Sequence, residues 1–182
     1  KTNYWTGSEC KKFEKEFSNY IGNKYSVAVS NGTAALHMAL LALEVGREDE
    51  VIIPSLTFVA DVNVVTLVGA IPILADATDL DDWNMSVEAI ESKITEKTKA
   101  VIVVHYAGYP CRDIVAICEL CRTKGIGLIE DVAHAPGATI DGRACGTFGD
   151  VGCFSFFSNK NLSIGEGGMV STLDIELNKK LG

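Results

Sequence analysis

Lys160 stands in a sequence context that differs from that of an ordinary surface lysine. An aromatic run over residues 154–157 precedes it, asparagines flank it at positions 159 and 161, and a glycine-rich segment follows at 165–168. This pattern predicts an organised turn rather than a charged helix face, although a solvated surface lysine is the simpler alternative. An amine held on such a turn can form a Schiff base with a carbonyl compound.

Asp131 is the second residue whose position suggests chemistry. Residues 125–131 read Gly-Ile-Gly-Leu-Ile-Glu-Asp, which predicts a short buried strand that ends at Asp131. Open α/β sheets bind ligands at the carboxyl ends of their strands. A carboxylate buried there needs a partner, and a protonated pyridine nitrogen would be one, whereas a helix N-cap is the alternative role. Lys160 and Asp131 therefore match a pyridoxal 5′-phosphate site, which needs a Schiff-base lysine and an acid partner for the ring nitrogen.

Residues 31–35, Asn-Gly-Thr-Ala-Ala, follow an expected strand and open an apolar helix. The free N–H groups of such a helix start, together with Gly32 and the Thr33 hydroxyl, predict a site for an anion. Ser155, five residues before Lys160, could add a second hydroxyl. Taken alone, a plain N-cap at Asn31 or Thr33 and a local hydrogen bond at Ser155 are the better explanation of these residues. The anion site gains weight because the strand before Asn31 would end at the same edge of the sheet as Asp131.

Two ring-bearing residues are further candidates. Phe58, in the segment 54–60 after another expected strand, either lies flat on a cofactor ring or belongs to the core. His134 follows Asp131 by three residues, and either lines the cofactor or has a structural role. We assign His37 and His105 to structure.

The elements that must position these residues alternate along the chain. Strands are expected at 25–29, 50–53, 71–75, 100–105, 126–130 and 151–156, and helices at 8–20, 33–43, 58–67, 87–94 and 112–124. Short apolar runs joined by helices predict an α/β fold, with a mostly parallel sheet between layers of helices. Asp-Gly at 141–142 predicts a hairpin, and 174–182 resembles the start of a further helix, as in a truncated chain. Residues 1–182 are expected to form one domain.

The composition excludes several classes of protein. The chain has 182 residues and a net charge of −8, which argues against binding to nucleic acid or to an anionic membrane surface. No run of about 18 apolar residues is present and residues 1–5 lack a signal-peptide pattern, so we expect a cytoplasmic protein. The six cysteines are expected to be free thiols, with Cys118 and Cys121 serving packing rather than metal or redox chemistry.

Several motifs, in order along the chain, resemble those of the DegT/DnrJ/EryC1/StrS family of sugar aminotransferases, which belong to fold type I of the pyridoxal phosphate enzymes. The matching segments are Trp-Thr-Gly at 5–7, Ser-Asn-Gly-Thr-Ala-Ala-Leu at 30–36, Pro-Ser-Leu-Thr-Phe-Val-Ala at 54–60, Val-His-Tyr-Ala-Gly at 104–108, Ile-Glu-Asp at 129–131 and residues 154–168. Nearly the whole chain is covered. The resemblance implies an α/β major domain over 1–182, and a smaller C-terminal domain that these residues lack.

The resemblance also implies roles for individual residues. Lys160 would carry the cofactor covalently, Asp131 would contact the pyridine nitrogen, and Phe58 would stack on the ring. Thr33, Ala34 and Ser155 would hold the phosphate, which the backbone could approach closely at Gly32, and His134 occupies a cofactor-lining position where many members carry glutamine.

The activity implied is transfer of an amino group from an amino-acid donor, expected to be glutamate, to the keto group of a nucleotide-linked sugar, as in polysaccharide biosynthesis. The active site would lie at a homodimer interface. The alternatives are a pyridoxal-phosphate-dependent keto-sugar dehydratase, a cyclitol aminotransferase, or a non-catalytic binding or regulatory protein on the same fold. Because the dehydrating relatives carry histidine in place of the lysine, Lys160 favours transamination.

Overall fold

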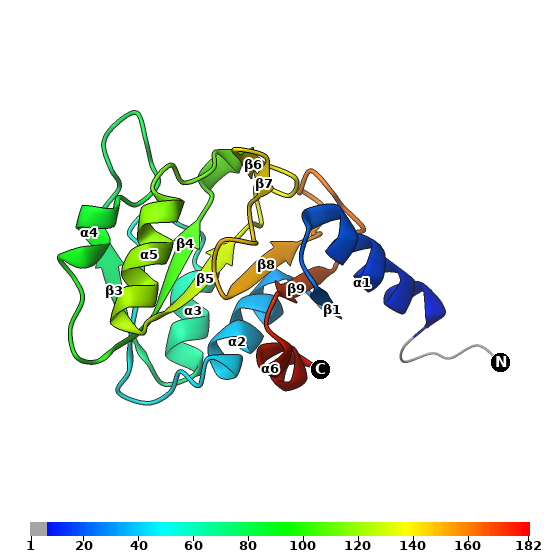
Figure 1. The fold of residues 1–182 in the computed structure, drawn as a ribbon, viewed down its shortest axis with the longest axis horizontal. Coiled ribbons are helices and arrows are strands. Elements are labelled where there is room, and N and C mark those ends of the chain that lie inside the picture. The colour runs from blue at the N-terminus through cyan, green and yellow to red at the C-terminus, as the bar shows by residue number, and fades with distance from the viewer. Residues whose placement is uncertain (1–6) are drawn as a thin grey trace.

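The computed structural model of the protein describes residues 7–182, so most of the motif at 5–7 and the N-terminal segment 1–5 lie outside the described residues. A seven-stranded sheet lies at the centre, in the order β1-β9-β8-β5-β4-β2-β3 (Figure 1). Its strands are β1 (Tyr25–Val29), β2 (Glu50–Pro54), β3 (Ile71–Ala75), β4 (Thr98–Val104), β5 (Gly127–Asp131), β8 (Val151–Ser155) and β9 (Gly168–Thr172). β9 is antiparallel to both of its neighbours, and the other strands all run in one direction. The predicted α/β fold with a mostly parallel sheet is confirmed.

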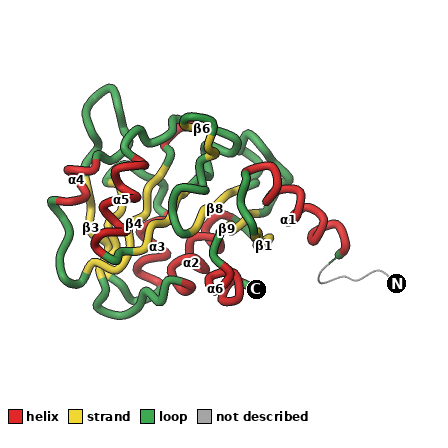
Figure 2. The backbone as a smooth tube through the Cα atoms, in the orientation of Figure 1, coloured by secondary structure: helices red, strands yellow, loops and turns green. Residues whose placement is uncertain are grey.

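Helices cover both faces of this sheet (Figure 2). They are α1 (Ser8–Ile21), α2 (Gly32–Ala42), α3 (Ala60–Leu67), α4 (Val87–Glu91), α5 (Ile114–Lys124) and α6 (Ile175–Leu181), with a 3-10 turn, η1 (Tyr106–Gly108). α2, α3 and α6 pack on one face, and α4 and α5 on the other. α1 packs over the β8 and β9 end of the sheet.

Alternation along the strands separates the two cores. On β5, Leu128 packs with α4 and α5, whereas Ile129 packs with α2 and α3. Because successive side chains of a strand point to opposite faces, Glu130 lies on the α5 side and Asp131 on the α2 and α3 side. The residue order of this strand therefore directs Asp131 toward the helices that follow β1 and β2.

The structure corrects several expected boundaries. Helix α3 begins at Ala60 rather than at 58, α5 begins at Ile114 rather than at 112, and α4 ends at Glu91 rather than at 94. The predicted hairpin is present as β6 (Thr139–Ile140) and β7 (Arg143–Ala144), with positive φ at Asp141 and Gly142 as a tight two-residue turn requires. Strand β9 is an addition that the sequence did not predict. Among residues 7–182, no helix combines the length and the apolar character needed to cross a membrane.

Candidate functional site

A cavity of about 420 Å³ lies at the carboxyl edge of the sheet. Because β1, β2, β5 and β8 run in the same direction, the loops that follow them meet at this edge. The cavity is lined by all the predicted site residues except Ala34, namely Gly32, Thr33, Phe58, Asp131, His134, Ser155 and Lys160. Residues from four separate segments of the chain are thus brought together at one cavity.

Lys160 lies on a turn after β8, as its sequence context predicted. Its backbone N–H donates to the carbonyl of Phe157 at 2.9 Å, which closes the turn. The side chain is partly buried and lines the cavity, so it is not a fully solvated surface lysine. Burial lowers the pKa of Lys160, whereas the nearby charge of Asp131 acts in the opposite direction. A lower pKa raises the fraction of neutral amine, which is the nucleophilic form.

Asp131 ends β5 with only 7 % of its surface exposed. Its Oδ1 accepts the N–H of Ala133 at 2.8 Å, and the described residues supply no hydrogen bond to the other carboxylate oxygen. Burial raises the pKa of Asp131, opposed first by that N–H and also by the charge of Lys160. A buried carboxylate with a free oxygen on a cavity fits a cationic N–H donor.

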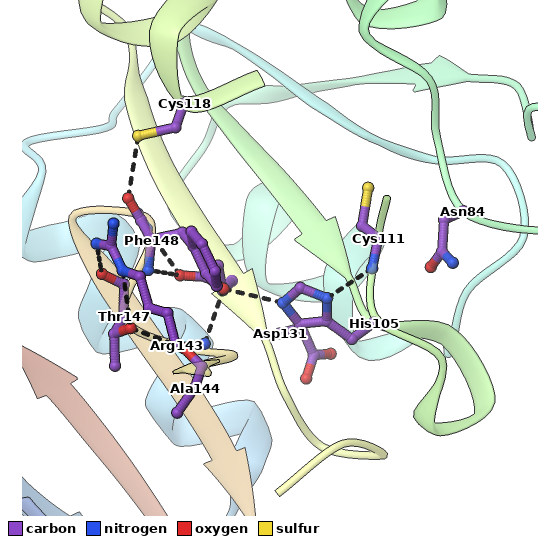
Figure 3. A network of polar contacts seen from close by, with 12 residues as sticks. Asn84, His105, Cys111, Cys118, Asp131, Arg143, Ala144, Thr147 and Phe148 are labelled. Carbon is purple, nitrogen blue, oxygen red and sulfur yellow. Dashed lines mark hydrogen bonds and ion pairs between the residues drawn. The ribbon is translucent and has the colours of Figure 1, made fainter. Parts of the chain in front are cut away.

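Glu130, the neighbour of Asp131 on β5, belongs to a separate buried network. Figure 3 shows other members of this network, among them His105, Cys111 and Phe148. The carboxylate of Glu130 is at the centre of these contacts. It accepts backbone N–H groups from Gly146, Phe148 and Gly149 at 2.6–2.7 Å and the Nε2–H of His105 at 2.9 Å. The Nδ1 of His105 in turn accepts the N–H of Cys111 at 3.0 Å. These contacts hold the ends of β4 and β5 together, and they give His105 the structural role predicted for it.

The start of α2 approaches the end of β8 very closely. A Cβ atom added at Gly32 would lie 2.8 Å from the Cβ of Ser155, so no larger residue fits without a shift of the backbone. Asn31 caps the helix, and its side chain accepts the N–H of Ala34 at 2.8 Å. Asn31 therefore has the N-cap role named as an alternative, while Gly32, Thr33 and Ser155 line the cavity beside it. Ala34 contributes its N–H to the cap and does not line the cavity.

Phe58 and His134 frame the mouth of the cavity. Phe58 is 67 % exposed, which excludes the alternative that it belongs to the core. The Nδ1 of His134 accepts the N–H of Ala107 at 3.3 Å, and the imidazole packs edge-on against Tyr106. Burial and the charge of Lys160 lower the pKa of His134. The neutral ring with its proton on Nε2 is the form that fits this contact, which makes His134 a donor.

Several residues at the cavity were not predicted from the sequence as site residues, and three of them carry polar side chains. Thr57 and Glu166 line it, and the fully buried Asp61 hydrogen-bonds to Thr57 through Oδ2. The sequence does contain a signal for Asp61. It is the only charged residue in the apolar stretch 51–75, and it follows Thr57 by four positions.

A larger hollow of about 650 Å³ lies beside η1 and the β6–β7 hairpin. Three aspartates, at 81, 82 and 141, line it together with one arginine, Arg112. This hollow contains neither a lysine nor a helix N-terminus of the kind that binds anions. The smaller cavity around Lys160 is therefore the candidate site.

Two curated relatives are similar to nearly the whole of this chain. GDP-perosamine synthase of Escherichia coli O157:H7 is 49 % identical over 168 residues, covering 92 % of this chain and 46 % of the relative. A UDP-N-acetyl-3-dehydro-alpha-D-glucosamine 3-aminotransferase of Acidithiobacillus ferrooxidans is 46 % identical over 176 residues, covering 96 % of this chain and 47 % of the relative. The chain thus spans about half the length of the curated relatives it matches.

A solved structure agrees with the fold. The X-ray structure of an aminotransferase from Psychrobacter cryohalolentis superposes with a TM-score of 0.94 at 44 % identity, covering 98 % of this chain and 45 % of that one. The model of the DegT/DnrJ/EryC1/StrS aminotransferase family matches residues 1–182 in full. With this match over its whole length, the chain belongs to the DegT/DnrJ/EryC1/StrS aminotransferase family.

Proposed function

We propose that the complete protein is a pyridoxal-phosphate-dependent aminotransferase that acts on the keto group of a nucleotide-linked sugar, with glutamate as the amino donor. The observation that carries the proposal is the placement of Lys160, Asp131 and the Gly32–Ser155 contact around one cavity. Membership of an aminotransferase family supports the reaction type. The names of two relatives, which concern GDP- and UDP-linked sugars, support the class of substrate.

The residues present fit pyridoxal phosphate. Its phosphate would accept N–H groups at the start of α2 and the hydroxyls of Thr33 and Ser155. The free carboxylate oxygen of Asp131 would bond to the pyridine nitrogen, and Phe58 would cover the ring. When bound, the cofactor supplies an electron sink next to the carbon that is aminated.

Lys160 would serve two purposes. Its amine would hold the cofactor covalently, and after release it would move a proton at the substrate carbon, as base and then as acid. The lowered pKa of Lys160 favours this because the neutral amine is the form that accepts a proton. His134 would donate its Nε2–H toward the molecule in the cavity.

We also propose that the rest of the protein contributes to the substrate pocket. These residues span less than half of the relatives named above, so a smaller C-terminal domain would complete the subunit. A homodimer, with the second subunit closing the cavity, is part of the same proposal.

Covalent trapping tests the assignment of the lysine. Full-length protein incubated with pyridoxal phosphate is reduced with borohydride, digested and mapped by mass spectrometry. We expect the label on Lys160 and none in Lys160→Ala. Lys124→Ala is the matched control, because Lys124 is exposed at the end of α5 and does not line the cavity. A label elsewhere, or none, would overturn the assignment.

The reaction type is tested separately. If glutamate alone changes the visible spectrum of the full-length protein and a nucleotide keto-sugar reverses the change with formation of an amino sugar, the aminotransferase proposal holds. Formation of a deoxy sugar without amine would favour the dehydratase. A spectrum that no amino donor changes would favour the non-catalytic binding protein.

A further inference from the structure

Asp61 is a carboxyl group enclosed in the apolar layer beneath the cavity. It lies in the first turn of α3, its exposed fraction is 0 %, and its neighbours Ala60 and Val64 belong to the core. Its Oδ2 shares a hydrogen bond with the hydroxyl of Thr57, which lines the cavity. Its Oδ1 is buried and has no hydrogen-bond partner among the described residues.

The charged groups around Asp61 oppose its ionisation. Asp131 on β5 is the charged residue that acts on it, and it carries the same sign. Lys160, His134 and His105 act on Asp131 instead. Cys153 on β8, the register partner of Asp131, is a buried thiol whose pKa burial raises well above its usual value, so it is neutral. Burial, and then Asp131, raise the pKa of Asp61 to about 8.

The carboxyl group of Asp61 can be ionised, protonated on Oδ1 or protonated on Oδ2. These three states differ in which polar atom is left without a hydrogen-bond partner. An ionised Asp61 would leave a buried charged oxygen, Oδ1, without a partner, which is the most costly case. A proton on Oδ1 would be a buried O–H donor with no acceptor. A proton on Oδ2 would donate to Thr57 and leave only a carbonyl-type oxygen unpaired, which is the deficit that proteins tolerate best.

We propose that Asp61 is a positioning residue: it is a neutral carboxylic acid that donates its proton to the Thr57 hydroxyl and leaves the proton of that hydroxyl free on the cavity side. Thr57 is then a hydrogen-bond donor toward an acceptor atom of any molecule in the cavity. Asp131 remains the one carboxylate charge of the pair. This arrangement does not depend on the identity of the cofactor.

Infrared spectroscopy of the full-length protein tests where the proton lies. At neutral pH we expect a carbonyl band of a protonated carboxylic acid that is lost in Asp61→Asn and retained in Glu96→Gln, which removes one exposed carboxylate. Thr57→Val should move the band, because the acid loses its hydrogen-bond partner. A band that persists in Asp61→Asn and disappears in Asp131→Asn would place the proton on Asp131 and overturn the proposal.

The pH dependence of thermal unfolding supplies a second test. Between about pH 4 and pH 8 the folded state retains a proton on Asp61 that the unfolded state has released, so this residue makes stability fall as pH rises. The variant Asp61→Asn lacks this titrating group. The melting temperature of the variant minus that of the native protein should therefore increase from pH 5 to pH 8 and then stay constant. Glu96→Gln is the control, and its melting temperature should follow that of the native protein at every pH. If the difference in melting temperature between Asp61→Asn and the native protein does not change with pH, Asp61 is ionised throughout and the proposal is refuted. If Asp61→Asn does not fold, loss of the infrared band from the native protein as pH rises through 8 decides the question.

Discussion

At the scale of single residues, Asp131 combines burial with a free carboxylate oxygen on the cavity. We predict that Asp131→Asn keeps the fold but lowers the aminotransferase rate of the full-length protein at least ~100-fold, or about 2.7 kcal/mol in the barrier. The amide cannot hold a pyridine nitrogen protonated. Steady-state kinetics with a nucleotide keto-sugar measure the loss, and circular dichroism checks the fold. A rate within tenfold of the native one would remove Asp131 from the proposed role.

A second prediction concerns the amine of Lys160. Burial lowers its pKa and the charge of Asp131 raises it, so the two effects oppose each other. Covalent attachment of pyridoxal phosphate should accelerate with rising pH, with a midpoint below that of an ordinary lysine. In Asp131→Asn this midpoint should move to still lower pH, because the opposing charge is gone. Stopped-flow absorbance at several pH values measures both midpoints, and a shift to higher pH would contradict the prediction.

The limits of reading single residues from the sequence are clear at Phe58 and Asp61. The sequence predicted Phe58 at the site but could not distinguish an exposed ring from a core ring, because that depends on whether anything packs over the loop. Asp61 was not predicted, since its burial follows from the packing of α3 against the face of the sheet that carries Asp131. Lys160 and Asp131 were predictable because local sequence alone specifies a turn and a strand end.

At the scale of elements, the close contact between α2 and β8 constrains the site. Gly32→Ala places a Cβ 2.8 Å from the Cβ of Ser155 and must push the helix start away from the strand. We predict a loss of stability of about 1–3 kcal/mol and at least tenfold weaker binding of pyridoxal phosphate. Gly46→Ala is the matched control, because an added Cβ there meets nothing within 4 Å. Equal affinities in the two variants would show that the close approach does not shape the proposed phosphate site.

The alternation of β5 leads to a different prediction for Glu130. Its carboxylate accepts three backbone N–H groups and the imidazole of His105, so Glu130→Gln turns an NH₂ group toward donors. We predict a loss of roughly 3 kcal/mol in the free energy of unfolding, against less than about 0.5 kcal/mol for the exposed Glu96→Gln. Chemical denaturation of the full-length protein measures both. Similar values for the two variants would mean that the network contributes little.

The sequence predicted the individual strands better than the pairing between strands. The six parallel strands were found because each is a short β-rich run, and helical segments follow the first four of them. β9 was missed because Gly168–Thr172 begins with the glycines of the preceding turn and contains few strongly β-forming residues. Its antiparallel pairing with β1 joins segments about 140 residues apart, and no local pattern in the sequence records such a contact.

At the scale of the whole molecule, Lys160 and Asp131 lie on one chain and line the same cavity. Mixing Lys160→Ala with Asp131→Asn should therefore restore no activity even if the subunits exchange, because every site in a mixed assembly still lacks one of the two groups. Activity assays after co-refolding of equal amounts measure this, and co-refolded native protein is the control for recovery. Activity above that of the separate variants would place the two groups in different subunits' sites.

The position of β9 between β1 and β8 also affects the order in which the protein can be built during synthesis. β1 emerges first, but its only partner strand among the described residues ends at Thr172, and Gly168 lies so close to Asn31 that an added Cβ would be 2.5 Å from its carbonyl carbon. At about 5–20 residues per second, a ribosome needs roughly 7–30 s to deliver that partner. Nascent chains that stop before Gly168 already contain Asp131 and Lys160, yet they lack the strand that anchors the start of α2. The start of α2 should therefore be the last part of the site to reach its final position, and until then the edge of β1 that pairs with β9 is unpaired.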